Sequence, residues 1–226
     1  PLLGGAHLTG KVSKYTLGLL SLQANDFEEI PSTNFSVIRV RRDVLRQSDI
    51  GGIFVNKAET GGNFNRTFGA DANFTFSKFL HLSSFLLMTS TTGTSEEDIA
   101  GHFSIAWADP LLIVQASYLS IEENFNAEVG FVPRQGMRKS SGTFGLRPRP
   151  GERIPSIREF EPSINVEYIT DQDNVLETRM MEGRFTVRFQ GGGLIWFAGK
   201  SHFERLSEPF LIRSNQTIPA GDYPFN

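Results

Sequence analysis

Cysteine is absent from this chain of 226 residues, which therefore forms neither disulfides nor thiolate metal sites. That absence does not by itself fix a cellular compartment. The formal net charge is only -3, so the chain as a whole has no electrostatic attraction to nucleic acid, and we expect no nucleic-acid partner. Aromatic residues other than phenylalanine are scarce, with 4 Tyr and 2 Trp against 20 Phe.

Long hydrophobic runs are also missing. No stretch reaches the roughly 18 consecutive apolar residues that indicate a transmembrane helix. The best candidate, 103–121, is interrupted by Asp109-Pro110 and by Gln115. The opening PLLGGAHLTG has no feature of a signal peptide, and we expect the chain to be a fragment or an excised domain of a longer protein. Transmembrane β-strands stay open as a reading, because each needs only about 9–11 residues.

Alternation of apolar and polar residues dominates the sequence, and the segment NRTFGADANFTFS (65–77) shows it best. Alternate side chains of a strand point to opposite faces. One face would carry Phe68, Ala70, Ala72, Phe74 and Phe76, and the other Asp71, Asn73 and Thr75. If the chain spans a membrane, we expect the first set to face lipid and the second to face inward.

The same period predicts about twelve strands, and one more near 209–213. They are expected at 5–12, 15–24, 34–45, 50–58, 65–77, 80–92, 100–108, 111–120, 138–146, 157–170, 176–190 and 194–203. The segment 37–47 could also form a basic amphipathic helix, but its β-branched residues and the following Gly51-Gly52 favour a strand. The 22 glycines suit a curved sheet.

The links between these strands differ in length. Short links are expected at 13–14, 59–62, 77–79 and 109–110, and longer polar links at 25–33, 92–100 and 121–137. Alternating short and long links are typical of outer-membrane barrels, which have short turns at one end and longer loops at the other.

Two classes of all-β protein remain open from the pattern alone. Several expected strands are longer than those of most soluble sandwiches, and the polar face carries charges in mid-strand: Arg39, Arg41, Asp43, Asp71, Glu167, Arg184 and Arg188. A polar lumen tolerates such charges, which favours an antiparallel up-and-down transmembrane β-barrel. The alternative is a soluble all-β carbohydrate-binding module or a glycan-active enzyme.

Four strings occur in order along the chain and carry a family resemblance. They are LGGAHLTGKVSKYTLGLLSLQ (3–23), FSVIRVRRDVLRQSDIGGIFVNK (35–57), NRTFGADANF (65–74) and FNAEVGFVPR (125–134). Together they resemble the C-terminal β-barrel domain, of unknown function, of a family of bacterial outer-membrane proteins. In that family the barrel often follows a module similar to family 9 carbohydrate-binding modules. The last string departs from the family pattern at Ala127, where proline is usual.

The resemblance implies a location in the bacterial outer membrane, with membrane lipid and lipopolysaccharide as partners. It implies one barrel domain over 1–226 that is the first part of a larger barrel, with any carbohydrate-binding module outside this chain. The function it implies is a pore or a surface platform linked to carbohydrate binding or uptake. It supplies no catalytic residues.

No motif in the sequence predicts catalysis, a cofactor or a metal. The four histidines share no metal-ligand spacing. The carboxylates Glu122, Glu123 and Glu128 near Arg134 could form an acid/base pair, as in glycoside hydrolysis, but their spacing gives no support to that reading. We therefore expect a protein that is not an enzyme.

The most unusual segment is RQGMRKSSGTFGLRPRPGERIPSIR (134–158), which is strongly basic and holds Glu152 as its one acid. It is either a solvated loop or lumen wall, or a site that faces anions such as lipopolysaccharide phosphates or anionic solutes. Its prolines predict an irregular loop at about 147–156. The candidate anion-facing residues are Arg138, Lys139, Arg147, Arg149 and Arg153.

Overall fold

The protein is described by a computed structural model over residues 1–28, 30–94, 98–213 and 216–226. Its regular structure is β-strand, apart from one short 3-10 helix among the described residues, η1 (Gly151–Arg153). The strands are β1 (Leu2–Val12), β2 (Tyr15–Ala24), β3 (Thr33–Leu45), β4 (Ser48–Glu59), β5 (Phe64–Thr75), β6 (Leu80–Thr91), β7 (Asp98–Ala108), β8 (Leu112–Ile121), β9 (Met137–Leu146), β10 (Ile157–Asp171), β11 (Leu176–Phe189), β12 (Leu194–Leu206), β13 (Phe210–Arg213), β14 (Gln216–Ile218) and β15 (Gly221–Phe225).

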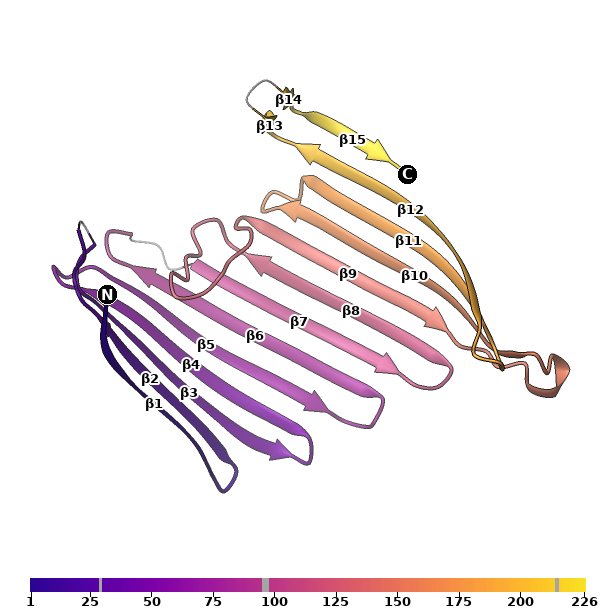
Figure 1. Cartoon of the computed structure of the whole chain (residues 1–226), viewed down its shortest axis with the longest axis horizontal. Coiled ribbons are helices and arrows are strands. Elements are labelled where there is room, and N and C mark those ends of the chain that lie inside the picture. The colour runs from indigo at the N-terminus through magenta and orange to yellow at the C-terminus, as the bar shows by residue number, and fades with distance from the viewer. Residues whose placement is uncertain (29, 95–97, 214–215) are drawn as a thin grey trace. The chain divides into compact units, whose positions relative to one another are not determined.

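Thirteen of these strands form one antiparallel sheet. Its order is β1 to β12 in sequence, followed by β15, while β13 and β14 pair only with each other (Figure 1). The sheet is open, because no ladder joins β1 to β15 among the described residues. Nor do those residues include a helix whose length and hydropathy would suit it to cross a bilayer.

The strand predictions are confirmed for β1 to β12, with only small differences at the strand ends. The segment 37–47 is largely a strand, in β3, and not a helix. At the C-terminal end, the strand predicted near 209–213 is confirmed as β13, which pairs with β14 and not with the main sheet. The thirteenth strand of the main sheet is β15, which the sequence pattern did not predict. The short β15 contains Pro224, which an edge strand tolerates but which hides the strand from a periodicity argument.

By internal contacts the chain divides into two compact units. Unit 1 contains Pro1–Phe103 and Leu119–Met137, and unit 2 contains Ser104–Tyr118 and Arg138–Asn226.

Strand register in unit 1 confirms the alternation predicted for 65–77. Phe68 lies opposite Phe54, whereas Asp71 lies opposite Gly51 and Asn73 opposite Asp49. The large apolar side chains in register with Phe68 therefore share one face of the sheet. Asp71 and Asn73 lie on the other face, which also carries Ile53, Phe85 and Leu87. The exposed members of the apolar face include Leu17, Leu19, Ile38, Val40, Ile50, Phe68 and Leu86.

Burial is inverted relative to a soluble domain. Among the described residues, the buried hydrophobic side chains are Ala100, Ile121, Phe125 and Met137. Buried polar and charged residues are more numerous: Thr33, Ser48, Asn65, Thr67, Thr89, Glu159, Thr170, Glu182 and Thr186. In unit 2, meanwhile, Phe197 is 66% exposed. Each unit thus buries polar side chains and leaves large apolar side chains exposed.

The links follow the expected asymmetry in part, since the links 60–63 and 172–175 after the even-numbered strands β4 and β10 contain only four residues each. Because neighbouring strands are antiparallel and in chain order, links after odd-numbered and even-numbered strands leave opposite ends of the strands. The long links 25–32 and 122–136 both follow even-numbered strands. The expected link 92–100 is shorter, because β7 begins at Asp98, and its residues 95–97 lie outside the described residues. Among the links after odd-numbered strands, the exception is the ten-residue link 147–156, which follows β9 and confirms the irregular loop predicted there.

Asp109 organises the tight link between β7 and β8. Its carboxylate accepts hydrogen bonds from the backbone N–H groups of Leu111 and Leu112, both at 2.7 Å, and from the Trp107 indole at 2.9 Å. The Trp107 bond and the two backbone bonds hold the pKa of Asp109 below its usual range. The charged carboxylate therefore stabilises this turn.

Gly51 permits an ion pair to cross a whole strand. Arg39 on β3 reaches over β4 to Asp71 on β5 in a two-pronged contact, with Nη2 of Arg39 2.8 Å from Oδ1 of Asp71. A Cβ at position 51 would lie 2.9 Å from the Arg39 guanidinium and 3.0 Å from the Asp71 carboxylate. A Cβ at the adjacent Gly52, on the other face, would meet only the Gly69 carbonyl oxygen, at 3.7 Å.

These two glycines give a matched test of the ion pair. We expect Gly51→Ala to destabilise the protein by about 1–3 kcal/mol, because the added methyl group overpacks the pair and displaces Arg39. Gly52→Ala should change stability by less than about 0.5 kcal/mol. Denaturant unfolding of both variants measures the difference, and equal effects would contradict the crossing geometry.

Candidate functional site

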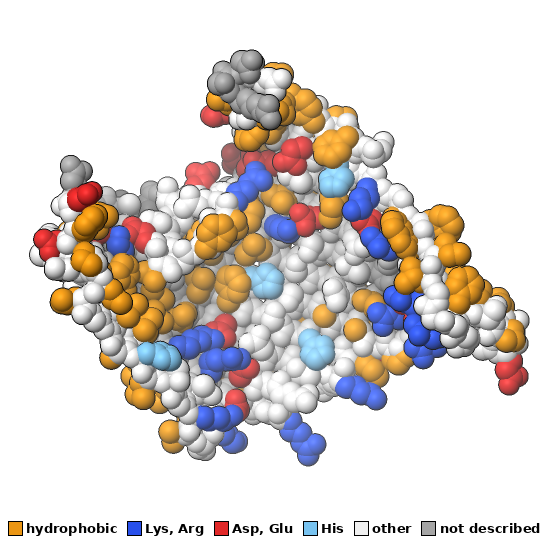
Figure 2. All heavy atoms as spheres, viewed as in Figure 1, with side chains coloured by type: hydrophobic (Ala, Val, Ile, Leu, Met, Phe, Trp, Pro, Cys, Tyr) orange, Lys and Arg blue, Asp and Glu red, His pale blue; other side chains and the backbone are white. Residues whose placement is uncertain are grey.

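Ion pairs cover much of the polar face of unit 1. Besides Arg39 and Asp71, Arg41 Nη2 lies 2.6 Å from Oδ1 of Asp49, and Lys11 Nζ lies 2.7 Å from Oδ2 of Asp43. Figure 2 shows acidic and basic side chains gathered next to one another on the face in view. Because each cation has a carboxylate from another strand, this part of the face is electrically balanced.

The 122–136 link folds back onto unit 1 instead of extending as a solvated loop. Phe125 at its start is only 2% exposed, the lowest value among the buried hydrophobic side chains. The side chain of Asn65 on β5 holds the link to the sheet through two hydrogen bonds. Its amide nitrogen donates to the Asn126 carbonyl oxygen at 2.7 Å, and its amide oxygen accepts from the Glu128 backbone N–H at 3.2 Å. The backbone N–H of Asn126 also donates to Thr89 at 3.2 Å.

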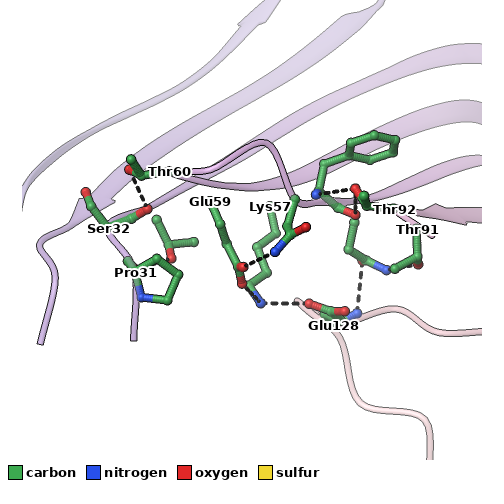
Figure 3. A network of polar contacts seen from close by, with 12 residues as sticks. Pro31, Ser32, Lys57, Glu59, Thr60, Thr91, Thr92 and Glu128 are labelled. Atoms are coloured by element: carbon green, nitrogen blue, oxygen red, sulfur yellow. Dashed lines mark hydrogen bonds and ion pairs between the residues drawn. The ribbon is translucent and has the colours of Figure 1, made fainter. Parts of the chain in front are cut away.

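A lysine joins this link to the strand ends. The Lys57 ammonium lies 2.7 Å from a carboxylate oxygen of Glu59 and 2.7 Å from one of Glu128, and Figure 3 shows it between the two. Asn63 donates to Glu59 at 3.4 Å in the same network. A cavity of about 270 Å³ lies here, lined by Lys57, Glu59, Asn63, Phe64, Asn65, Thr91, Thr92 and Glu128.

The chemistry of this cavity is that of a mixed hydrogen-bonding site. Two carboxylates against one ammonium leave a formal charge of -1. The carboxylates that the sequence placed near Arg134 are held by different groups, since Glu128 pairs with Lys57 while Glu122 accepts the Ile99 backbone N–H at 2.7 Å. Contacts of this kind anchor the link, and they give the acid/base hypothesis no added support.

The five candidate anion-facing residues fall into two groups in unit 2. At the start of β9, Arg138 donates to the Asn174 side chain at 2.8 Å and Lys139 pairs with Glu167 at 2.7 Å. The other three, Arg147, Arg149 and Arg153, lie beyond the end of β9. Seven residues of extended chain, 140–146, separate the two groups, so that Lys139 and Arg147 lie about 27 Å apart along the strand. The structure therefore does not bring the five together.

Carboxylates of β10 accompany the second group. Arg149 Nε lies 3.2 Å from Glu159, and Arg147 Nε lies 3.9 Å from Glu161. Arg188 of β11 contacts both carboxylates, at 3.6 Å and 3.0 Å. The basic segment singled out in the sequence ends at residue 158, so the prediction did not include the carboxylates of Glu159 and Glu161. Glu159 and Glu161 are two residues apart, and that spacing on a strand would have placed both on one face.

Arg153 lies in η1 and is exposed, and the structure gives it no ionic partner among the described residues. Arg158 completes the group from β10, with Nη2 3.7 Å from Glu159. Within the described ranges, no three His, Asp or Glu side chains come close enough to hold a metal ion.

Comparison of the chain with protein-family models, with curated proteins and with solved structures finds no match. The roles of these residues therefore rest on their own geometry.

Asn65 offers a direct test of the folded-back link. We expect Asn65→Ala to destabilise the docked link by about 2 kcal/mol, because it leaves the Asn126 carbonyl and the Glu128 N–H without their partner. Amide hydrogen exchange in 122–136 should then rise roughly 30-fold. Asn73→Ala, on the same face of the same strand but bonded to Asp49, is the matched control. Unchanged exchange in the Asn65 variant would show that the link is held by other contacts.

Proposed function

We propose that this chain forms part of the wall of a transmembrane β-barrel in a bacterial outer membrane, with its apolar face toward lipid and its polar face toward a lumen. The observation that carries the proposal is the inverted burial. Large side chains such as Leu86 and Phe197 are 57% and 66% exposed, while Asn65, Glu159 and Glu182 are buried.

The exposed apolar surface is too extensive for a monomeric soluble protein. Soluble monomers rarely expose contiguous apolar patches of more than a few hundred square ångströms. Here each unit carries exposed apolar side chains, and in each unit some of them line a groove. A groove of about 530 Å³ in unit 2 is lined by Phe144, Leu146, Pro162, Ser163, Ile164, Gly183, Arg184, Phe185, Phe197, Ala198 and Gly199. Lipid acyl chains are flexible and apolar, and they would fill such grooves.

Strand length fits a bilayer as well. β1 to β12 contain 10 to 15 residues each. A ten-residue strand extends about 33 Å. Tilted by about 40°, it crosses roughly 25 Å, which is the height of the apolar band of outer-membrane barrels. Longer strands such as β10 would project beyond that band at one end.

To close into a barrel, the open sheet needs further strands that pair with its two edge strands, β1 and β15. An open edge presents unpaired backbone N–H and C=O groups, which lipid cannot satisfy. The family resemblance implies a barrel with more strands than this chain supplies, and such strands would pair with β1 and β15. The folded-back link 122–136 would then lie on the luminal side, because Asn65 and Thr89 hold it on the polar face.

A barrel of this kind would act as a pore or as a surface platform. The paired charges and the buried hydroxyl groups of the polar face suit a water-filled interior. The link to carbohydrate binding or uptake rests on the resemblance alone.

Partition tests the membrane proposal directly: the full chain should fold only with detergent or lipid vesicles and should migrate heat-modifiably on gels. A monodisperse, folded protein in buffer alone would favour the soluble all-β alternative.

An adjacent pair of residues on β5 tests which face meets lipid. Ala72→Arg places a guanidinium on the apolar face, and we expect it to destabilise the protein folded in lipid vesicles by about 2 kcal/mol. Asn73→Arg, on the polar face near Asp49, should have an effect close to zero. Denaturant titrations of both variants in vesicles measure the difference, and equal losses would argue against lipid on one side.

A further inference from the structure

We propose that the arginines around Glu159 and Glu161 in unit 2 form a binding site for a phosphate-type dianion. The cluster contains Arg147, Arg149, Arg158 and Arg188. Four guanidinium groups surround two carboxylates, which leaves a formal excess of two positive charges. The site differs from the one expected from sequence, because it excludes Arg138 and Lys139 and includes two residues of β10 and β11.

Two of the arginines keep unused donors. Arg147 and Arg158 lie 3.9 Å and 3.7 Å from their carboxylates, which are ion-pair contacts beyond hydrogen-bonding distance. Their side chains are 41% and 50% exposed. Since a guanidinium carries five N–H donors in a fixed fork, each can hold a phosphate oxygen pair without leaving its present place.

The two glutamates position the arginines instead of cancelling them. The Glu159 side chain is only 8% exposed, and it contacts three arginines at once: Arg149, Arg158 and Arg188. A buried carboxylate holds neighbouring cations in place, so less side-chain entropy is lost when a ligand arrives. By contrast, Lys139 and Glu167 at the other end of β9 form a one-to-one pair at 2.7 Å, which leaves no surplus charge.

A polar cavity of about 230 Å³ adjoins the cluster. It is lined by Arg147, Glu161 and Arg188, and also by Ser163 and Asn165, which supply a hydroxyl and an amide for hydrogen bonds. Its volume is below the usual range of pockets for drug-sized ligands. A small phosphate or phosphate monoester fits this size. The cavity lining carries two of the four arginines and one carboxylate, while Arg149 and Arg158 lie beside Glu159, outside the lining.

The position of the cluster also restricts the source of the phosphate. The 147–156 link follows an odd-numbered strand, as do the short links 13–14 and 46–47. In outer-membrane barrels the short turns lie on the periplasmic side, away from lipopolysaccharide. The phosphate therefore comes from a periplasmic solute or from a phospholipid headgroup. This last step rests on the proposed function, whereas the site itself does not.

Titration calorimetry with inorganic phosphate on the full chain, in the detergent that keeps it monodisperse, tests the site. We expect the wild-type protein to bind phosphate and the Arg147→Gln, Arg158→Gln double variant to bind at least tenfold more weakly. Lys139→Gln should bind like the wild type. Arg147→Lys keeps the charge but loses the fork, so its affinity should fall between the two.

Three results would overturn the site: no phosphate binding by the wild type, equal binding by the double variant, or an equal loss in Lys139→Gln. Denaturant unfolding of each variant shows that a loss of binding is not a loss of fold. A second titration with dihexanoyl phosphatidic acid separates the sources, since tighter binding than inorganic phosphate assigns the site to a headgroup and weaker binding assigns it to a solute. Partition into vesicles is measured separately, so failure of the barrel proposal and failure of the site are distinguishable.

Discussion

Backbone hydrogen bonding between neighbouring antiparallel strands is the constraint on which this structure depends. With four buried hydrophobic side chains among the described residues, a packed apolar core cannot supply the stability of the sheet. The ladder from β1 to β12 and β15 instead satisfies the backbone groups of nearly every strand. These backbone hydrogen bonds stabilise the sheet in water. They stabilise it more in lipid, where an unpaired backbone group costs several kcal/mol. The apolar face is then free to meet a solvent other than protein.

Pairing on the polar face follows from the register of that ladder. Arg39 reaches Asp71 because β3, β4 and β5 lie in one register and because the residue between them is Gly51. The identity of residue 51 on β4 thus depends on side chains of both adjacent strands. A one-residue slip of β4 would turn Gly51 to the apolar face. In one direction the slip would put the Ile50 side chain under the guanidinium, and in the other it would put Gly52 there. The glycine and the ion pair therefore disfavour one of the two possible slips.

Much of the fold could be predicted from periodicity, because alternation is a local property of each strand. The facing of Phe68 and Asp71 followed directly from their odd and even positions. The ion-pair partners of the charged side chains could not be predicted in this way, because they depend on the register between strands. For that reason the charges of Glu159 and Glu161 were not matched to the basic segment beside them. The folded-back link was missed for a related reason. Nothing in the sequence distinguishes the buried Phe125 from the exposed Phe131 of the same link, and the bonds from Asn65 to the link depend on contacts between segments far apart in the chain.

The distribution of surplus charge indicates where the polar face can act. The three pairs made by Lys11, Arg39 and Arg41 in unit 1 each join one cation to one carboxylate, so they contribute little field beyond their own contacts. At the 147–156 link, four arginines share two carboxylates, and two of the arginines stand beyond hydrogen-bonding distance. Attraction between unit charges at about 4 Å is about 1 kcal/mol in water and several times greater near a protein surface. A dianion there would meet two uncompensated charges without having to break a pair, whereas at Arg39 it would first have to displace Asp71. Chemical selectivity on this face therefore follows from incomplete pairing, and not from the number of arginines.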